Sequence, residues 1–178
     1  QSQVHDFAWF ADKRYRVLKG EVELPHSKRK VTSWALLTPQ NTKFWKQAIE
    51  YINDGTYYYS LWNGDYPYNQ VTAVDGTISA GGGMEYPNVT VIGNASSNEE
   101  LEVVIVHEVG HNWFYGILGS NERVHGWMDE GLNTFLQYLA ELVCHALRRR
   151  STYCSYQRHW TFQTGSLDTR PGNCIIPQ

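Results

Sequence analysis

The chain has 178 residues, which is the length of one ordinary globular domain and enough to bury a core without covalent staples. Its 15 Lys and Arg residues against 18 Asp and Glu give a net charge of −3, which argues against the basic surface of nucleic-acid-binding proteins. Apolar residues make up 42% and no apolar run is long enough to span a membrane, so we expect a soluble domain with neither nucleic acid nor a membrane as partner.

Charge is distributed unevenly along the chain. Residues 1–147 contain ten Lys and Arg residues against seventeen Asp and Glu, whereas residues 148–178 contain five Arg residues and one Asp. Such a shift in composition is typical of a boundary between a domain and a tail. We therefore predict one domain over residues 1–147 and a basic tail, to which the pattern assigns no structure, over residues 148–178.

The cysteines and the start of the sequence leave the cellular compartment open. The cysteines form no Cys-x-x-Cys pair and define no disulfide framework; they are Cys144, Cys154 and Cys174. The sequence starts at Gln1 without an initiator Met or a leader, so we expect a processed chain or a piece of a longer one. A cytoplasmic, periplasmic or secreted location agrees with this composition.

The first half of the sequence predicts a sheet with one helix. Strand patterns occur within residues 7–24 and over residues 31–37, 71–74 and 89–92. From Asn41 to about Leu61, apolar residues recur at intervals of three and four, which indicates an amphipathic helix. Asn63-Gly64-Asp65 is expected to end this helix.

Two long helices are predicted in the second half. Ser97 and Glu100 have the spacing of a capping box, so the first helix should begin at about Asn98 and continue to Phe114. The second is predicted over residues 127–150, where three arginines would lie near the negative end of the helix dipole.

The first of these helices contains the pattern HExxH, as His107-Glu108-Val109-Gly110-His111. Four residues of helix turn through about 400°, so the two imidazoles lie on one face, one turn apart, and can bind one ion. Glu108 projects about 100° to the side, where it would act on a water molecule as a general base. The pattern therefore predicts a Zn²⁺ site with His107 and His111 as ligands and Glu108 as the catalytic residue. The alternative is that the histidines only lie on the surface of an amphipathic helix.

A catalytic zinc site needs a third protein ligand and one open position. The metzincin pattern requires Gly and His three and six residues after His111, but Phe114 and Ile117 stand there. Glu130 follows His111 after eighteen residues and opens the second helix, and an antiparallel helix pair would bring it back to the histidines. We predict Glu130 as the third ligand of one Zn²⁺ ion. The nearest candidates for orienting the imidazoles are Asp129, Asn133 and Thr134.

HExxH followed by eighteen residues and Glu resembles the signature of the M1 family of zinc aminopeptidases. Upstream, residues 82–87 read Gly-Gly-Met-Glu-Tyr-Pro, where that family has a Gly-x-Met-Glu-Asn motif; Tyr86 replaces the usual Asn. The resemblance implies an α+β catalytic domain of thermolysin-like type, with a mixed β-sheet followed by a zinc-binding helix pair. It also implies that Glu85 binds the free α-amino group of a peptide. The backbone of Gly82, Gly83 and Met84 would pair with that peptide as an added strand.

The function that this resemblance implies is zinc-dependent hydrolysis of peptide bonds, with removal of N-terminal residues from peptides. Two alternatives stay open: an endopeptidase of the same superfamily, and a catalytically weak zinc-bound remnant that binds peptides. Members of the family stabilise the oxyanion with a tyrosine, which is expected beyond Gln178, with Tyr153 and Tyr156 as the candidates within the sequence. The remainder of a larger M1-type chain is expected as a further partner.

Overall fold

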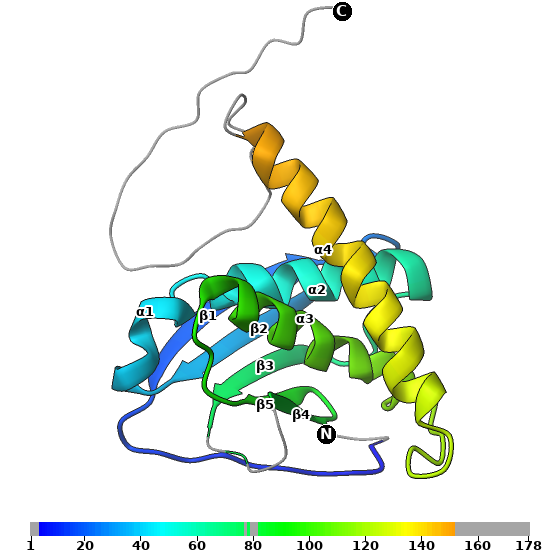
Figure 1. Ribbon diagram of the computed structural model, residues 1–178, viewed down its shortest axis with the longest axis horizontal. Helices are drawn as coiled ribbons and strands as arrows, with labels where there is room; N and C mark the ends of the chain where they lie inside the picture. The colour runs from blue at the N-terminus through cyan, green and yellow to red at the C-terminus, as the bar shows by residue number, and fades with distance from the viewer. Residues whose placement is uncertain (1–3, 77, 79–81, 152–178) are drawn as a thin grey trace, which may run out of the picture.

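The computed structural model describes residues 4–76, 78 and 82–151. This part of the chain forms a mixed five-stranded sheet with helices on one face, so the predicted α+β class is confirmed (Figure 1). The strands are β1 (Arg16–Glu23), β2 (Lys30–Leu37), β3 (Gln70–Asp75), β4 (Gly83–Tyr86) and β5 (Val89–Ile92). The helices are α1 (Thr42–Trp45), α2 (Ala48–Asn63), α3 (Asn98–Phe114) and α4 (Leu132–Ser151), with a 3₁₀ turn η1 (Pro39–Asn41) and a π-helical turn η2 (Trp127–Gly131).

The strands lie in the order β1-β2-β3-β5-β4. The two outer pairs, β1–β2 and β4–β5, are antiparallel, whereas β3 is parallel to both of its neighbours. Along β2 every second side chain is buried, as expected for a strand with one face on the core: Val31, Ser33, Ala35 and Leu37. Among the described residues β4 pairs on one side only, so its outer edge can accept another extended chain.

Two predicted elements differ from the structure in their bounds. The strand expected within residues 7–24 begins only at Arg16. The helix expected from Asn41 is divided, because α1 ends at Trp45 and α2 begins at Ala48. Both parts bury apolar side chains on the same core, so the periodic pattern continues across the break. The spacing of apolar residues predicts which face of a segment is buried, but it does not predict whether the segment forms one unbroken helix.

The helix that carries both histidines begins where its capping residues predict. The Ser97 hydroxyl accepts a hydrogen bond from the main-chain N of Glu100 at 3.1 Å, which satisfies one free N–H of the first turn. The Glu100 carboxylate accepts from the main-chain N of Ser96 at 2.7 Å, one residue earlier than in the usual capping box.

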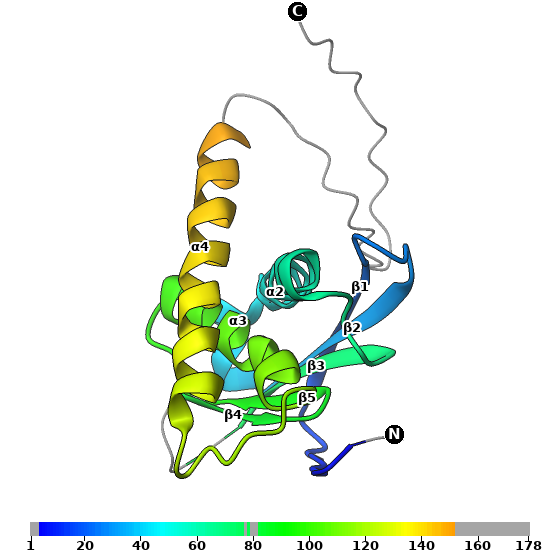
Figure 2. The ribbon, with the colours of Figure 1, turned by 90° about the vertical axis from the view of Figure 1, so that its right-hand side faces the viewer.

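The helices form two layers on the sheet (Figure 2). α2 and α3 lie against the strands, and α4 crosses them on the side away from the sheet. α2 and α3 approach closely at Gly55, where an added Cβ would lie 3.5 Å from Val106 Cα. The core between the layers is aliphatic and aromatic, and its largest members include Trp45, Tyr59, Tyr66 and Ile105.

α4 continues beyond residue 147 to Ser151. The candidate tyrosines Tyr153 and Tyr156, and the cysteines Cys154 and Cys174, lie outside the described residues. Within the described part of the chain, no helix combines the length and the apolar character needed to cross a membrane.

Candidate metal site

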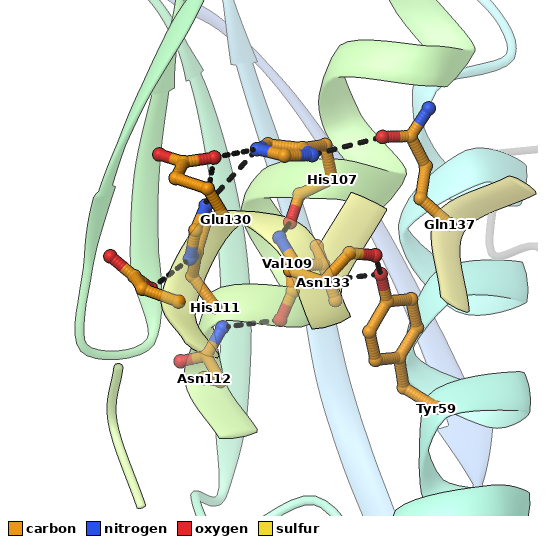
Figure 3. A network of polar contacts seen from close by, with 9 residues as sticks. Tyr59, His107, Val109, His111, Asn112, Glu130, Asn133 and Gln137 are labelled. Atoms are coloured by element: carbon orange, nitrogen blue, oxygen red, sulfur yellow. Dashed lines mark hydrogen bonds and ion pairs between the residues drawn. The ribbon is translucent and has the colours of Figure 1, made fainter. Parts of the chain in front are cut away.

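The three predicted ligands meet where η2 passes the middle of α3. The Nε2 atoms of His107 and His111 lie 3.1 Å apart. One carboxylate oxygen of Glu130 lies 3.2 Å from His107 Nε2 and 3.8 Å from His111 Nε2 (Figure 3). The helix pair therefore brings together two nitrogen donors and one oxygen donor that are separated by up to 23 residues in the sequence. These three groups can hold a metal ion.

The outer nitrogen of each imidazole is held by an acceptor. His107 Nδ1 lies 2.9 Å from Gln137 Oε1, and His111 Nδ1 lies 2.7 Å from Asp129 Oδ1. The amide nitrogen of Gln137 donates to Glu141 Oε1 at 2.8 Å, which turns its oxygen toward His107. Each Nδ1 therefore donates, and each Nε2 presents its lone pair to the common point. Imidazoles held in this way can act as metal ligands, so the donor set fits a zinc ion.

The buried carboxylate of Asp129 also sets the charge at this point. Burial acts to lower the pKa of His111, but the hydrogen bond of Asp129 and the charges of Glu85, Asp129 and Glu108 together outweigh it and raise that pKa. Burial and the neighbouring His111 lower the pKa of His107. Asp129 thus stabilises positive charge on the His111 ring, including the charge of a cation bound at its other nitrogen.

Glu108 lies beside the histidines without sharing their point of convergence. Its side chain is only 6% exposed, and Oε2 has no hydrogen-bond partner within the described residues. Burial raises the pKa of Glu108 to about 8. A Cβ on Gly83 of β4 would lie 2.2 Å from Glu108 Oε1, so the glycine is what makes room for this carboxylate.

A cavity of about 280 Å³ opens between β4 and α3 at this point. The predicted substrate-binding residues Gly83, Met84 and Glu85 line it together with Glu108 and His111. Gly82 precedes β4 and accepts a hydrogen bond through its carbonyl oxygen from the main-chain N of Gly93. Burial raises the pKa of Glu85, which is 9% exposed. An edge strand, a carboxylate and the histidine face of α3 therefore border one cavity.

Sequence reasoning missed several residues at the site. Gln137 lies seven residues after Glu130, two helical turns along the same face, and this spacing was the available signal. Glu122 and Arg123 also line the cavity, but they lie in a loop that carries no periodic pattern. Of the three candidates for orienting the imidazoles, only Asp129 contacts a ring. Asn133 donates instead to the main-chain oxygen of His107 at 2.9 Å.

Comparisons with known proteins found similarity to aminopeptidases over a short segment of the chain. No protein-family model matches the chain. The chain is 32% identical over 47 residues to aminopeptidase M1-D of Oryza sativa subsp. japonica, and 35% identical over 46 residues to aminopeptidase M1 of Arabidopsis thaliana. Each match covers 26% of this chain, and the matched segment spans only 5% of the length of either relative.

Two solved structures resemble the fold. Legionella pneumophila aminopeptidase A in complex with aspartic acid aligns with a TM-score of 0.58 at 16% identity, over 71% of this chain and 16% of that one. The E323A mutant of an M1 zinc metallopeptidase from Deinococcus radiodurans aligns with a TM-score of 0.49 at 18% identity, over 78% of this chain and 33% of that one.

The fold is that of part of an aminopeptidase, which confirms the predicted fold class. The resemblance to the M1 aminopeptidases is also confirmed: a segment of 46 to 47 residues of this chain is similar to members of that family, and it spans only 5% of their length.

Proposed function

We propose that this chain is the zinc-binding part of a metallopeptidase that removes N-terminal residues from peptides. The observation that supports this most is the convergence of two imidazole Nε2 atoms and the Glu130 carboxylate, with both Nδ1 atoms held by outer acceptors. His107, His111 and Glu130 would hold one Zn²⁺. Bound there, zinc would supply Lewis-acid chemistry, polarising the scissile carbonyl and lowering the pKa of water at the site.

Glu108 is the proposed general base. Its carboxylate lies in the cavity next to the ligands, and burial raises its pKa to about 8, so its ionised form is a stronger proton acceptor than an exposed carboxylate. It would take a proton from the attacking water and pass it to the leaving amine. Gly83 keeps the space into which this carboxylate fits.

β4 is the proposed substrate-binding strand. Its outer edge can pair with an extended peptide, through the backbone of Gly82, Gly83 and Met84. Because side chains alternate along a strand, Glu85 points to the same face as Gly83, which is the face that contacts Glu108. A carboxylate at this position can pair with the ammonium group of a peptide's first residue, which favours exopeptidase over endopeptidase activity.

The rest of a larger M1-type chain is the proposed partner for completing the active site. The oxyanion-stabilising tyrosine is expected there or at Tyr153 or Tyr156. If neither supplies it, this chain would bind zinc and peptides with little turnover.

The test uses the purified 178-residue chain loaded with zinc. We expect one zinc per chain, hydrolysis of aminoacyl anilides that stops with chelator, and no hydrolysis by Glu108→Gln. Glu85→Ala should remove the preference for a free over an acetylated amino terminus. Stoichiometric zinc without turnover would favour the peptide-binding remnant, unchanged preference in Glu85→Ala would favour the endopeptidase, and absence of zinc would contradict the proposal.

A further inference from the structure

One buried amide joins the two helices that carry the zinc-binding side chains. Asn133 has no exposed surface and lies three residues after Glu130, in the first turn of α4. Its Nδ2 donates to the main-chain oxygen of His107 on α3 at 2.9 Å (Figure 3). Its Oδ1 accepts from the Tyr59 hydroxyl of α2 at 2.8 Å. A single side chain therefore connects three helices at the turn that carries the first histidine.

Gly110 makes this close approach possible. An added Cβ at Gly110 would lie 2.0 Å from Asn133 Oδ1 and 2.4 Å from Tyr59 Cζ. This glycine stands within the HExxH pattern, directly before His111. α2, α3 and α4 thus come close together between the two histidines, where a side chain larger than hydrogen fits only if Asn133 and Tyr59 move.

Few other contacts fix the position of Glu130. Its side chain is 60% exposed, and within the described residues its carboxylate contacts the two histidines themselves. It lies in a π-helical turn, a rare form that occurs mostly as a single turn and frequently at functional sites. The bonds that join η2 and α4 to α3 include those of Asp129 and Gln137, which end on the imidazole rings, and the buried bond of Asn133, which ends on the main chain of His107.

We propose that Asn133 is a positioning residue, which sets where the Glu130 carboxylate meets the two imidazoles, with Tyr59 and Gly110 holding it in place. This inference rests on the proposed zinc site. It assigns to Asn133 a role separate from that of Gln137 and Asp129, which orient the rings and do not tie η2 and α4 to α3 through the backbone.

Replacement of Asn133 by Ala tests this inference, because it removes both side-chain hydrogen bonds of Asn133 and still leaves the Tyr59 hydroxyl with an acceptor. The Tyr59 hydroxyl also lies 2.9 Å from the main-chain oxygen of Asn133, an acceptor that the variant keeps. Loss of a group that supports a metal ligand from outside typically weakens metal affinity 10- to 100-fold. We expect a loss of about this size in N133A, with the zinc-induced rise in Tm reduced accordingly.

The experiment measures zinc affinity by competition with a chromophoric chelator, together with the Tm of metal-free and zinc-loaded protein. Thr134→Ala is the matched control, since it truncates the neighbouring half-buried residue of the same turn and should leave zinc affinity within twofold. Tyr59→Phe keeps the ring and removes the hydroxyl that holds Asn133; it should weaken zinc binding by a smaller factor, and it serves if N133A does not fold.

The outcomes separate this inference from the function on which it rests. If N133A lowers the Tm of the metal-free protein but binds zinc as tightly as wild type, Asn133 is structural and the inference is overturned. The same holds if Tyr59→Phe folds and binds zinc with unchanged affinity while N133A is unfolded. If the wild-type chain binds no zinc, the proposed function itself is wrong.

Discussion

Replacing Gly83 by Ala should displace the proposed general base and leave the metal ligands in place. A Cβ at this position would lie 2.2 Å from Glu108 Oε1, 2.4 Å from Cδ and 2.5 Å from Cγ. Ordinary contact begins at 3.4 Å, so the carboxylate must move by about 1.2 Å, the difference between 3.4 and 2.2. A displacement of about 1 Å in a reacting group costs on the order of 10²-fold in rate. We therefore expect kcat on an aminoacyl anilide to fall about 100-fold in G83A.

Zinc binding serves as the control measurement for this experiment. Glu108 is not a predicted ligand, so zinc content and zinc affinity of G83A should match those of wild type. Gly82→Ala is the matched control, because its Cβ would meet only the Val104 side chain, 3.3 Å from Cγ2 and 3.8 Å from Cγ1, and a small shift relieves the closer contact. A G83A variant with kcat within twofold of wild type would refute the placement of Glu108 as the base. Loss of zinc from G83A would show that the carboxylate supports the metal instead.

Three further predictions follow from the same contacts. Glu108→Gln should keep its zinc and lose at least 10²-fold in kcat, measured by metal analysis and steady-state kinetics; retention of activity would exclude the base role. Gln137→Ala should weaken zinc binding about 10-fold, because His107 loses the acceptor that fixes its tautomer, and a titration that gives the wild-type constant would contradict this. Gly110→Ala should lower the free energy of unfolding by about 1–3 kcal/mol in urea, because its Cβ meets Asn133 and Tyr59. Gly55→Ala on α2 is its control: the Cβ makes ordinary contacts with α3 at 3.5 to 3.7 Å, so the change should be neutral or slightly stabilising.

The elements that sequence predicts well are those whose cause is local. Ser97 and Glu100 satisfy N–H groups within their own turn, so the start of α3 could be read from four residues. The two histidines share a face for a reason of helix geometry alone, and Glu130 returns to them because η2 and α4 pack against α3. These local rules were sufficient to locate the candidate ligands.

The features of the fold and of the candidate site that the sequence did not predict depend on contacts between distant segments. The bond between Tyr59 and Asn133 joins residues 74 positions apart, and no spacing rule connects them. The break between α1 and α2 could not be predicted, because apolar residues recur at intervals of three and four on both sides of it. The π-helical turn that carries Glu130 adds a residue to one turn, and no residue pattern in the sequence marks that addition. The packing role of Gly110 likewise becomes apparent only when α2 and α4 are both in place.

Anomalous scattering at the zinc absorption edge, from crystals of the zinc-loaded chain, tests the central claim most directly. We expect one peak about 2.0–2.2 Å from Nε2 of His107, Nε2 of His111 and a carboxylate oxygen of Glu130. No peak at this position, or a peak elsewhere with these three side chains apart, would contradict the proposed metal site and the peptidase function that depends on it.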